Sequence, residues 1–152
     1  MITAWRIVHP KYAEEAFSGE GPRLRGGRWN RNGTAVVYTS VSVALATLEL
    51  LVHNQRALRL PEYLLFSCSF PDAIVETIRR DLLPPNWREY PAPPELREIG
   101  NKWLVSSASA VLEVPSVLTE EPNYLLNPAH EDFKSIDIGQ PRAFKLDLRL
   151  LT

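Results

Sequence analysis

Residues 35–54 read AVVYTSVSVALATLELLVHN, a short β-branched and aromatic run followed at once by a longer apolar run. The first part, residues 35–40, has the composition of a β-strand. In the second part, residues 42–54, apolar side chains recur with the period of a helix, and Ser42 is a suitable N-cap. The sequence therefore predicts a strand that leads directly into a helix.

One carboxylate, Glu49, lies inside this otherwise apolar helix. On a 3.6-residue period it falls near the edge of the core-facing side, which it shares with Leu45, Ala46, Val52 and His53. An ionised carboxylate that leaves water without a partner costs several kcal/mol or shifts its pKa. We therefore expect Glu49 to meet either a cation of the protein or a polar ligand.

A glycine-rich loop is expected at residues 18–33, just before the strand. Five of the chain's seven glycines lie in it, together with four arginines and a tryptophan. Its most specific string is GGRWN at residues 26–30. Two glycines allow the backbone to pass close to a bulky group, and the planar guanidinium of Arg28 matches phosphate or carboxylate.

Arg28, Tyr38 and Glu49 would be contributed by a loop, a strand and a helix that follow one another. Together they suit a dinucleotide: Arg28 can hold a pyrophosphate, Tyr38 can stack on a flat heterocycle, and Glu49 can bind ribose hydroxyls. A purely structural Arg–Glu pair explains the same residues. From these residues alone both interpretations stay open.

The remaining elements alternate without a regular pattern of helical crossovers. Helices are expected at residues 12–17 and 95–108, and an irregular proline-rich segment at 81–94. Strands are expected at residues 4–8, 63–70, 110–114, 123–126 and 142–150. The predicted fold class is α+β, with mixed, largely antiparallel sheets and flanking helices.

Composition restricts the setting and the partners. A length of 152 residues suits one domain. Seventeen basic and eighteen acidic residues nearly cancel, so the net charge does not attract the protein to nucleic acid or to membranes. The first residues lack the apolar core of a signal peptide, and no apolar run is long enough to span a bilayer. The single cysteine, Cys68, lies in an apolar run and indicates a reducing compartment. We therefore expect a cytoplasmic protein.

Other chemistries have weaker support in the sequence. His9, His53 and His130 are far apart and have no cysteine or histidine at ligand spacing, so no metal site is predicted. Ser116 follows a proline at a predicted strand end and taken alone suits a turn. Asn123 taken alone suits a turn or cap as well.

Taken together, these strings resemble the RES domain, the toxin half of bacterial RES–Xre toxin–antitoxin modules. The family takes its name from an arginine, a glutamate and a serine, which align with Arg28, Glu49 and Ser116. The resemblance covers residues 1–152 as a single RES-like domain. It is carried by Trp5-Arg6-Ile, GGRWN at 26–30, Tyr38-Thr-Ser, Ala44-Leu-Ala-Thr-Leu-Glu49, Val114-Pro-Ser116 and Asn123-Tyr-Leu-Leu-Asn-Pro-Ala-His130.

The resemblance implies a fold similar to ADP-ribosyltransferase toxins and an enzyme that consumes NAD+ as a substrate, with no separate cofactor. It implies cleavage of the nicotinamide–ribose bond by hydrolysis or phosphorolysis, followed by growth arrest. Arg28, Glu49 and Ser116 would be catalytic, and Arg6, Tyr38 and Asn123 would join Arg28 and Glu49 in binding NAD+. The alternatives are mono-ADP-ribosylation of a protein and a non-catalytic nucleotide-binding module.

The resemblance also implies a partner. A cognate Xre-like antitoxin, which carries the DNA-binding region, would cover the active site. This chain itself would bind neither nucleic acid nor a membrane. The chain is also expected to be able to form a homodimer or a larger complex with the antitoxin.

Overall fold

The computed structural model describes residues 1–53 and 61–151, whose main elements are one sheet and three α-helices. The helices are α1 (Glu20–Arg25), α2 (Val43–His53) and α3 (Pro94–Ser106). The strands are β1 (Ile2–Val8), β2 (Val37–Ser40), β3 (Glu62–Phe70), β4 (Val75–Thr77), β5 (Val111–Pro115), β6 (Pro122–Leu126), β7 (Asp137–Ile138) and β8 (Arg142–Lys145).

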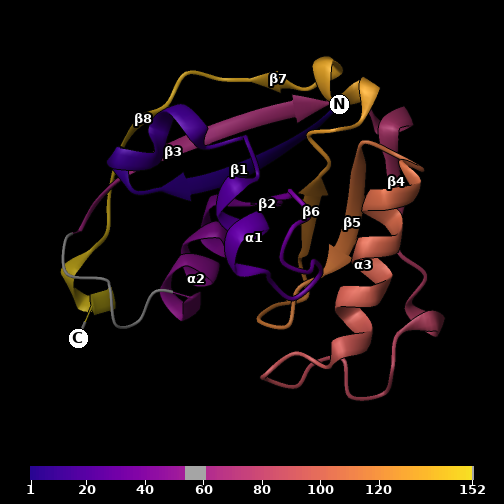
Figure 1. The fold of residues 1–152 in the computed structure, drawn as a ribbon. Coiled ribbons are helices and arrows are strands. Elements are labelled where there is room, and N and C mark those ends of the chain that lie inside the picture. The colour runs from indigo at the N-terminus through magenta and orange to yellow at the C-terminus, as the bar shows by residue number, and fades with distance from the viewer. Residues whose placement is uncertain (54–60, 152) are drawn as a thin grey trace.

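Within the described residues the eight strands form one mixed sheet. Its order is β4-β5-β6-β2-β1-β3-β7, with β8 also paired to β3. Every pairing is antiparallel except β4 with β5. In Figure 1, β1 and β3 run across the direction of β5 and β6, and β2 lies between the two groups. The predicted α+β class with largely antiparallel pairing is confirmed.

The strand and helix predicted at residues 35–54 are β2 and α2. The Ser42 hydroxyl accepts a hydrogen bond from the Leu45 amide at 3.1 Å, so Ser42 is the N-cap. Leu45 and Ala46 are buried, as the helical period predicts. The described helix ends at His53, and Asn54, the predicted last residue, lies outside the described residues.

The strand register places α2 and α3 on the same face of the sheet. Trp5 of β1 pairs with Ser40 of β2, which pairs with Asn123 of β6, and side chains that face one another across a pair share a face. On this face Ile7 of β1 packs with Ala46 of α2. Farther along, β5 and β6 pack with α3 through Leu112, Val114, Leu125, Leu96 and Trp103. Figure 1 shows α1 between these two helices.

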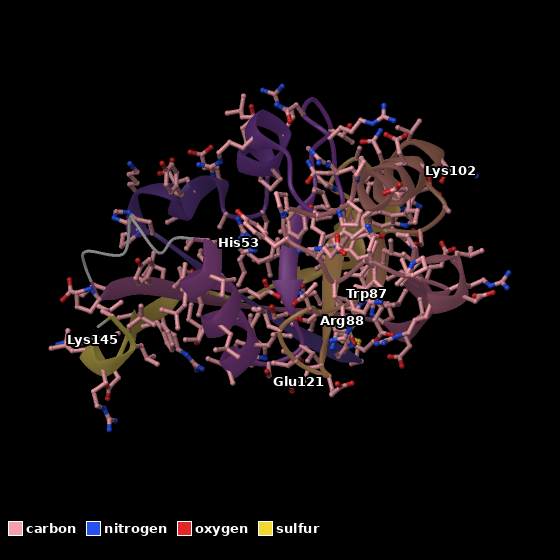
Figure 2. The ribbon with its side chains drawn as sticks, turned by 90° about the horizontal axis from the view of Figure 1, so that it is seen from below. His53, Trp87, Arg88, Lys102, Glu121 and Lys145 are labelled. Atoms are coloured by element: carbon pink, nitrogen blue, oxygen red, sulfur yellow. The ribbon has the colours of Figure 1, made fainter. Side chains whose placement is uncertain are left out.

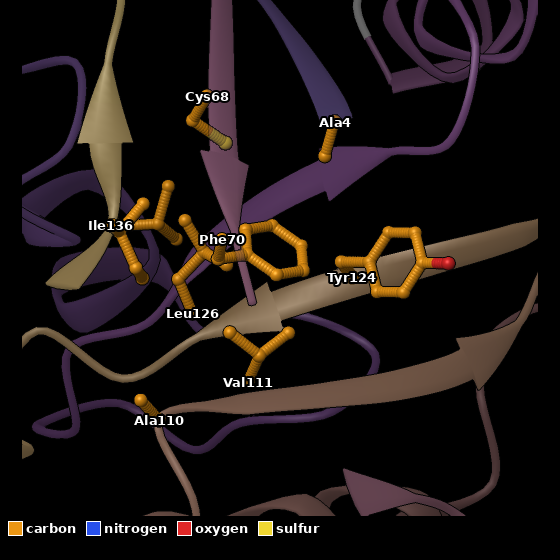
Figure 3. Close-up of a cluster of buried hydrophobic side chains, with 9 residues drawn as sticks. Ala4, Cys68, Phe70, Ala110, Val111, Tyr124, Leu126 and Ile136 are labelled. Carbon is orange, nitrogen blue, oxygen red and sulfur yellow. The ribbon is translucent and has the colours of Figure 1, made fainter. Parts of the chain in front are cut away.

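The opposite face carries a second apolar core. Figure 3 shows Phe70 of β3 at its centre, between the strands and the segment that contains Ile136. Its buried members are Ala4, Val37, Cys68, Phe70, Ala110, Val111, Tyr124, Leu126 and Ile136. Burial raises the pKa of the Cys68 thiol to about 12, which keeps it protonated and unreactive at neutral pH.

Three predicted elements were wrong. Residues 12–17 do not form an amphipathic helix; a 3₁₀ helix occupies Pro10–Glu15, because Pro10 favours the first turn and the His9 side chain caps it. The loop at 18–33 contains the helix α1. Gly19, which precedes this helix, has a left-handed backbone conformation. The strand predicted at 142–150 ends at Lys145 and is followed by a 3₁₀ helix at Leu148–Leu151.

The early end of that last strand has a local cause. The Asp147 carboxylate accepts a hydrogen bond from the Arg149 amide at 2.9 Å, which turns the chain out of the extended conformation. The alternation of apolar residues in this segment had suggested a longer strand. Two short strands, β4 and β7, were not predicted. No helix among the described residues is long and apolar enough to cross a membrane.

Candidate active site

Glu49 lies where α2 meets the ends of β5 and β6. Its Oε1 accepts hydrogen bonds from the Asn123 amide nitrogen at 2.8 Å and from the Ser116 hydroxyl at 3.1 Å. Glu49 is far along the chain from Ser116 and Asn123, and the fold brings it into direct contact with both. Ser116 is buried, and the Glu49 side chain is 23% exposed, which places it at the edge of the core as predicted.

The neighbours of Asn123 and Ser116 fix their orientation. Ser40 lies beside Asn123 across the β2–β6 pair, and its hydroxyl donates to the Asn123 side-chain oxygen at 2.7 Å, so that the amide nitrogen faces Glu49. The Ser116 oxygen accepts from the Leu118 amide at 3.0 Å, so its own proton is available to Glu49. Ser116 is therefore a turn serine that also holds the carboxylate.

The second oxygen of Glu49 faces His53, one helical turn farther along α2. The distance from Glu49 Oε2 to His53 Nε2 is 3.3 Å. Burial by itself would raise the pKa of the Glu49 carboxyl, but hydrogen bonds from His53, Asn123 and Ser116 and the charge on His53 outweigh it. The net pKa lies below the ordinary value, so Glu49 is ionised at neutral pH.

Arg28 approaches from the GGRWN loop and is held mainly by backbone oxygens. Its Nη1 donates to the carbonyls of Trp87 at 3.0 Å and Glu89 at 3.2 Å. Burial lowers the pKa of Arg28, and the charge of Glu49 is the strongest effect that opposes this. Among the described residues no ion pair joins Arg28 directly to Glu49, so the two charges interact across space. Figure 2 shows Trp87 and Arg88 on the segment that precedes α3, and His53 at the end of α2.

Tyr38 anchors the loop that carries Arg28. Its hydroxyl donates to the Asn30 side-chain oxygen at 2.6 Å and accepts from the Trp29 amide at 3.1 Å. Burial raises the pKa of Tyr38 far above the physiological range. A Cβ on residue 27 would lie 2.6 Å from this hydroxyl, so only glycine fits at this position without a shift of its neighbours. The hydroxyl end of Tyr38 is thus occupied, and its half-buried ring packs against the apolar cluster that contains Trp29 and Leu125.

Asn30 organises the same loop from inside. It is fully buried, and its amide nitrogen donates to the carbonyls of Pro22, Arg31 and Thr34 at 2.8 to 3.1 Å. We expect Asn30→Asp to lower the free energy of unfolding by about 2 kcal/mol, because a carboxylate would face three carbonyls with no donor of its own. Urea denaturation measures this change.

Asn32→Asp is the matched control for that prediction. Asn32 lies in the same loop but is exposed, and its amide makes one long contact, to the Leu24 carbonyl at 3.3 Å. Its free energy of unfolding should stay within about 0.5 kcal/mol of the wild-type value. Equal losses in the two variants would show that Asn30 does not organise the loop.

Arg6 lies behind this arrangement. Its side chain starts from the face of β1 opposite to Trp5, and its guanidinium donates to the carbonyls of Ala16 at 2.6 Å and Tyr38 at 3.0 Å. Burial lowers the pKa of Arg6 to about 10, so it remains charged at neutral pH. Arg6 is therefore linked to the site through the backbone of Tyr38. A role for Arg6 in binding a dinucleotide stays a prediction.

Some members of the arrangement were not predicted as site residues. His53 was placed on the same side of the helix as Glu49, and its i, i+4 spacing was the available signal for a contact. Ser40 belongs to the Tyr38-Thr-Ser string, but its contact with Asn123 depends on strand register. The carbonyls of Trp87 and Glu89 gave no signal in the sequence, because their position depends on the path of a proline-rich segment. In residues 1–53 and 61–151, no group of three or more His, Cys, Asp or Glu side chains is placed to hold a metal ion.

The chain is similar to proteins of one family. A family model described as the RES domain matches residues 3–147. Toxin Res of Yersinia enterocolitica is 41% identical over 148 residues, covering 96% of this chain and 97% of the relative. The Prs ADP-ribosylating toxin of a Sphingobium species is 40% identical over 154 residues, covering 97% of this chain and 95% of the relative.

A solved structure supports the fold. This chain is similar to a chain in the crystal structure of the M. tuberculosis MbcT–MbcA toxin–antitoxin complex, with a TM-score of 0.77 and 17% sequence identity. The alignment covers 95% of this chain and 84% of that chain. At this identity the similarity concerns the arrangement of the backbone.

Proposed function

This chain belongs to the RES domain family, and from that premise we propose that it is the toxin of a toxin–antitoxin pair and cleaves the nicotinamide–ribose bond of NAD+. The observation that carries the proposal is the Glu49 carboxylate. It is ionised, partly exposed and oriented by Ser116 and Asn123. A site that only bound phosphate would gain nothing from a carboxylate near its arginine.

The proposed reaction needs a negative group beside the ribose. When the bond between nicotinamide nitrogen and ribose C1′ breaks, the electron pair leaves with neutral nicotinamide and positive charge develops on the ribose. Glu49 would bind the ribose hydroxyls and stabilise that charge more strongly than it stabilises bound NAD+. An acceptor oxygen, from water or phosphate, then bonds to C1′ and releases its proton.

The other residues would position the dinucleotide. Arg28 has guanidinium donors beyond the Nη1 that contacts Trp87 and Glu89, and these can hold the diphosphate. The ring of Tyr38 would stack near the nicotinamide, while its hydroxyl keeps the loop in place. Ser116 and Asn123 would keep Glu49 in one orientation, and Asn123 would add to the binding of the ribose.

The decisive experiment mixes purified protein with NAD+ and follows free nicotinamide by chromatography. We expect nicotinamide to appear with time, together with ADP-ribose in water or ADP-ribose 1″-phosphate in phosphate buffer. Absence of nicotinamide release in both buffers, with a folded protein, would contradict cleavage. Binding of NAD+ without release would instead indicate a nucleotide-binding module.

A second candidate function is favoured by one relative. The Sphingobium relative is named an ADP-ribosylating toxin, and transfer to a protein shares the same bond cleavage. In that case adenylate-labelled NAD+ would transfer its label to protein in a cell extract. Label retained on a protein band after denaturing electrophoresis would favour transfer, and label found only in small molecules would favour hydrolysis or phosphorolysis.

The partner proposed for this chain is an antitoxin of the Xre type that covers the site. Support comes from the fold that this chain shares with a chain of the MbcT–MbcA toxin–antitoxin complex. Expression in the cytoplasm, where NAD+ is available, should arrest growth, and co-expression with the antitoxin should restore it. A substitution that removes activity but keeps the fold should also restore growth.

Replacement of Arg28 should act mainly on substrate binding. We expect Arg28→Ala to raise the KM for NAD+ roughly tenfold or more, because a charge-assisted hydrogen bond contributes about 1.5–3 kcal/mol, and to change kcat less. Steady-state kinetics of nicotinamide release separate the two constants. Arg25→Ala, an exposed arginine of the preceding helix, should leave both unchanged. An unchanged KM in Arg28→Ala would show that Arg28 is structural.

A further inference from the structure

The Glu49 carboxylate has a third protein partner that differs in kind from the other two. Ser116 and Asn123 both bind Oε1 and are neutral at every physiological pH. His53 faces Oε2 at 3.3 Å and can carry a charge. Both oxygens of Glu49 are therefore held, one by two neutral groups and the other by a titratable group.

His53 is also the accessible member of this set. Its side chain is 68% exposed, whereas that of Glu49 is 23% exposed. Solvent protons can reach the imidazole, and a substitution there removes little packing. The backbone of His53 belongs to the last turn of α2, so the i, i+4 spacing places the ring beside Glu49.

The charge on His53 would act on the group that the reaction uses. A neutral imidazole can donate its Nε2 proton to Oε2 and orient the carboxylate, which can still accept a ribose hydroxyl. A protonated imidazole also neutralises much of the negative charge that should stabilise the ribose cation. Arg28, which approaches from the GGRWN loop, is a further charged group that interacts with Glu49 across space.

We propose that His53 is a positioning residue that orients Glu49 and sets its effective charge, so that protonation of His53 slows the cleavage of NAD+. This inference rests on the proposed function. It adds His53 to the residues that act on the Glu49 carboxylate. Its consequence is a turnover that falls as the medium becomes more acidic.

The position of that fall separates His53 from Glu49. Hydrogen bonds and the charge on His53 hold the pKa of the Glu49 carboxyl below its ordinary value, so Glu49 is protonated at lower pH than an ordinary glutamate. Histidines change charge between about pH 5 and 8. A decline of kcat in that interval therefore cannot be assigned to protonation of Glu49.

The experiment measures kcat and KM for nicotinamide release between about pH 5 and 8. The wild-type protein should lose activity toward acidic pH. His53→Gln keeps a donor but does not titrate, so its profile should be flat and its kcat near pH 8 close to the wild-type value. His53→Leu has no donor, and its kcat near pH 8 should fall about fivefold, the effect of one neutral hydrogen bond, with little change in KM.

His9→Gln is the matched control, because His9 is a histidine that caps a 3₁₀ helix and should not affect the profile. Identical pH profiles of wild type and His53→Gln would overturn the inference and leave the proposed function intact. A wild-type protein that released no nicotinamide would instead overturn the proposed function.

A second measurement does not depend on activity. The chain has three histidines, so their imidazole resonances can be assigned from single substitutions. Glu49→Gln should shift the resonances of His53 and leave those of His9 and His130 in place. An unshifted His53 resonance would overturn the contact on which the inference depends.

Discussion

Glu49→Gln should reduce kcat for nicotinamide release by about 10²–10³, the usual effect of removing one preorganised electrostatic contact. The substitution removes the charge and keeps the shape. Its amide oxygen can still accept the hydrogen bonds that Ser116 and Asn123 donate to Oε1. The thermal midpoint should therefore change little, and the loss should lie in turnover. Single-turnover kinetics with saturating NAD+ measure it directly.

Glu120→Gln is the control for this prediction. Glu120 is an exposed glutamate in the connection between β5 and β6, which also contains Ser116. Its replacement changes the net charge by the same amount and should leave kcat unaltered. A Glu49→Gln variant that turned over NAD+ at the wild-type rate would exclude Glu49 from the proposed role.

Gly100→Ala should destabilise the protein by more than about 3 kcal/mol. Gly100 lies in α3 against the backbone of Trp29, and a Cβ there would overlap the Trp29 carbonyl oxygen and lie 2.7 Å from its carbon. Trp29 is buried, so neither side can move away cheaply. Without this clash, alanine would favour the helix by up to about 1 kcal/mol. The thermal midpoint should fall by roughly 10 °C.

The matched control is Gly21→Ala in α1. The nearest heavy atom to a Cβ there is the end of the Arg25 side chain at 3.0 Å, which is flexible and exposed. Its stability should equal or slightly exceed the wild-type value, and differential scanning calorimetry of the two variants gives the comparison. Similar midpoints for Gly100→Ala and wild type would show that α3 and the GGRWN loop are not tightly packed.

The strand and helix at residues 35–54 could be predicted because each has a clear local signal. β-branched and aromatic residues indicate β2, and a serine cap followed by helical periodicity indicates α2. The edge position of Glu49 follows from the same period. Residues 18–33, by contrast, were assigned to a loop on the strength of their glycines, but five backbone-flexible positions do not prevent one short helix between Gly19 and Gly26.

The composition of the site could be predicted in part. The meeting of Glu49 with Ser116 and Asn123 depends on β5 and β6 ending beside α2, a tertiary arrangement that no local pattern encodes. The resemblance to a family identified these residues. The interpretation of Ser116 as a turn residue covers only its contact with the Leu118 amide, and the interpretation of Asn123 as a turn or cap residue was wrong, because Asn123 lies in β6. Arg28 was expected to face a ligand or Glu49, and its carbonyl partners depend on the path of a distant segment.

The contact between Arg28 and the carbonyls of Trp87 and Glu89 implies an unequal tolerance to genetic change. Every amino acid supplies a main-chain oxygen, so the identity of residues 87 and 89 can drift while the guanidinium keeps its acceptors. An insertion or deletion between this segment and α3 would shift both oxygens at once. In this part of the chain, natural variation should therefore change the identity of residues far more readily than the number of residues.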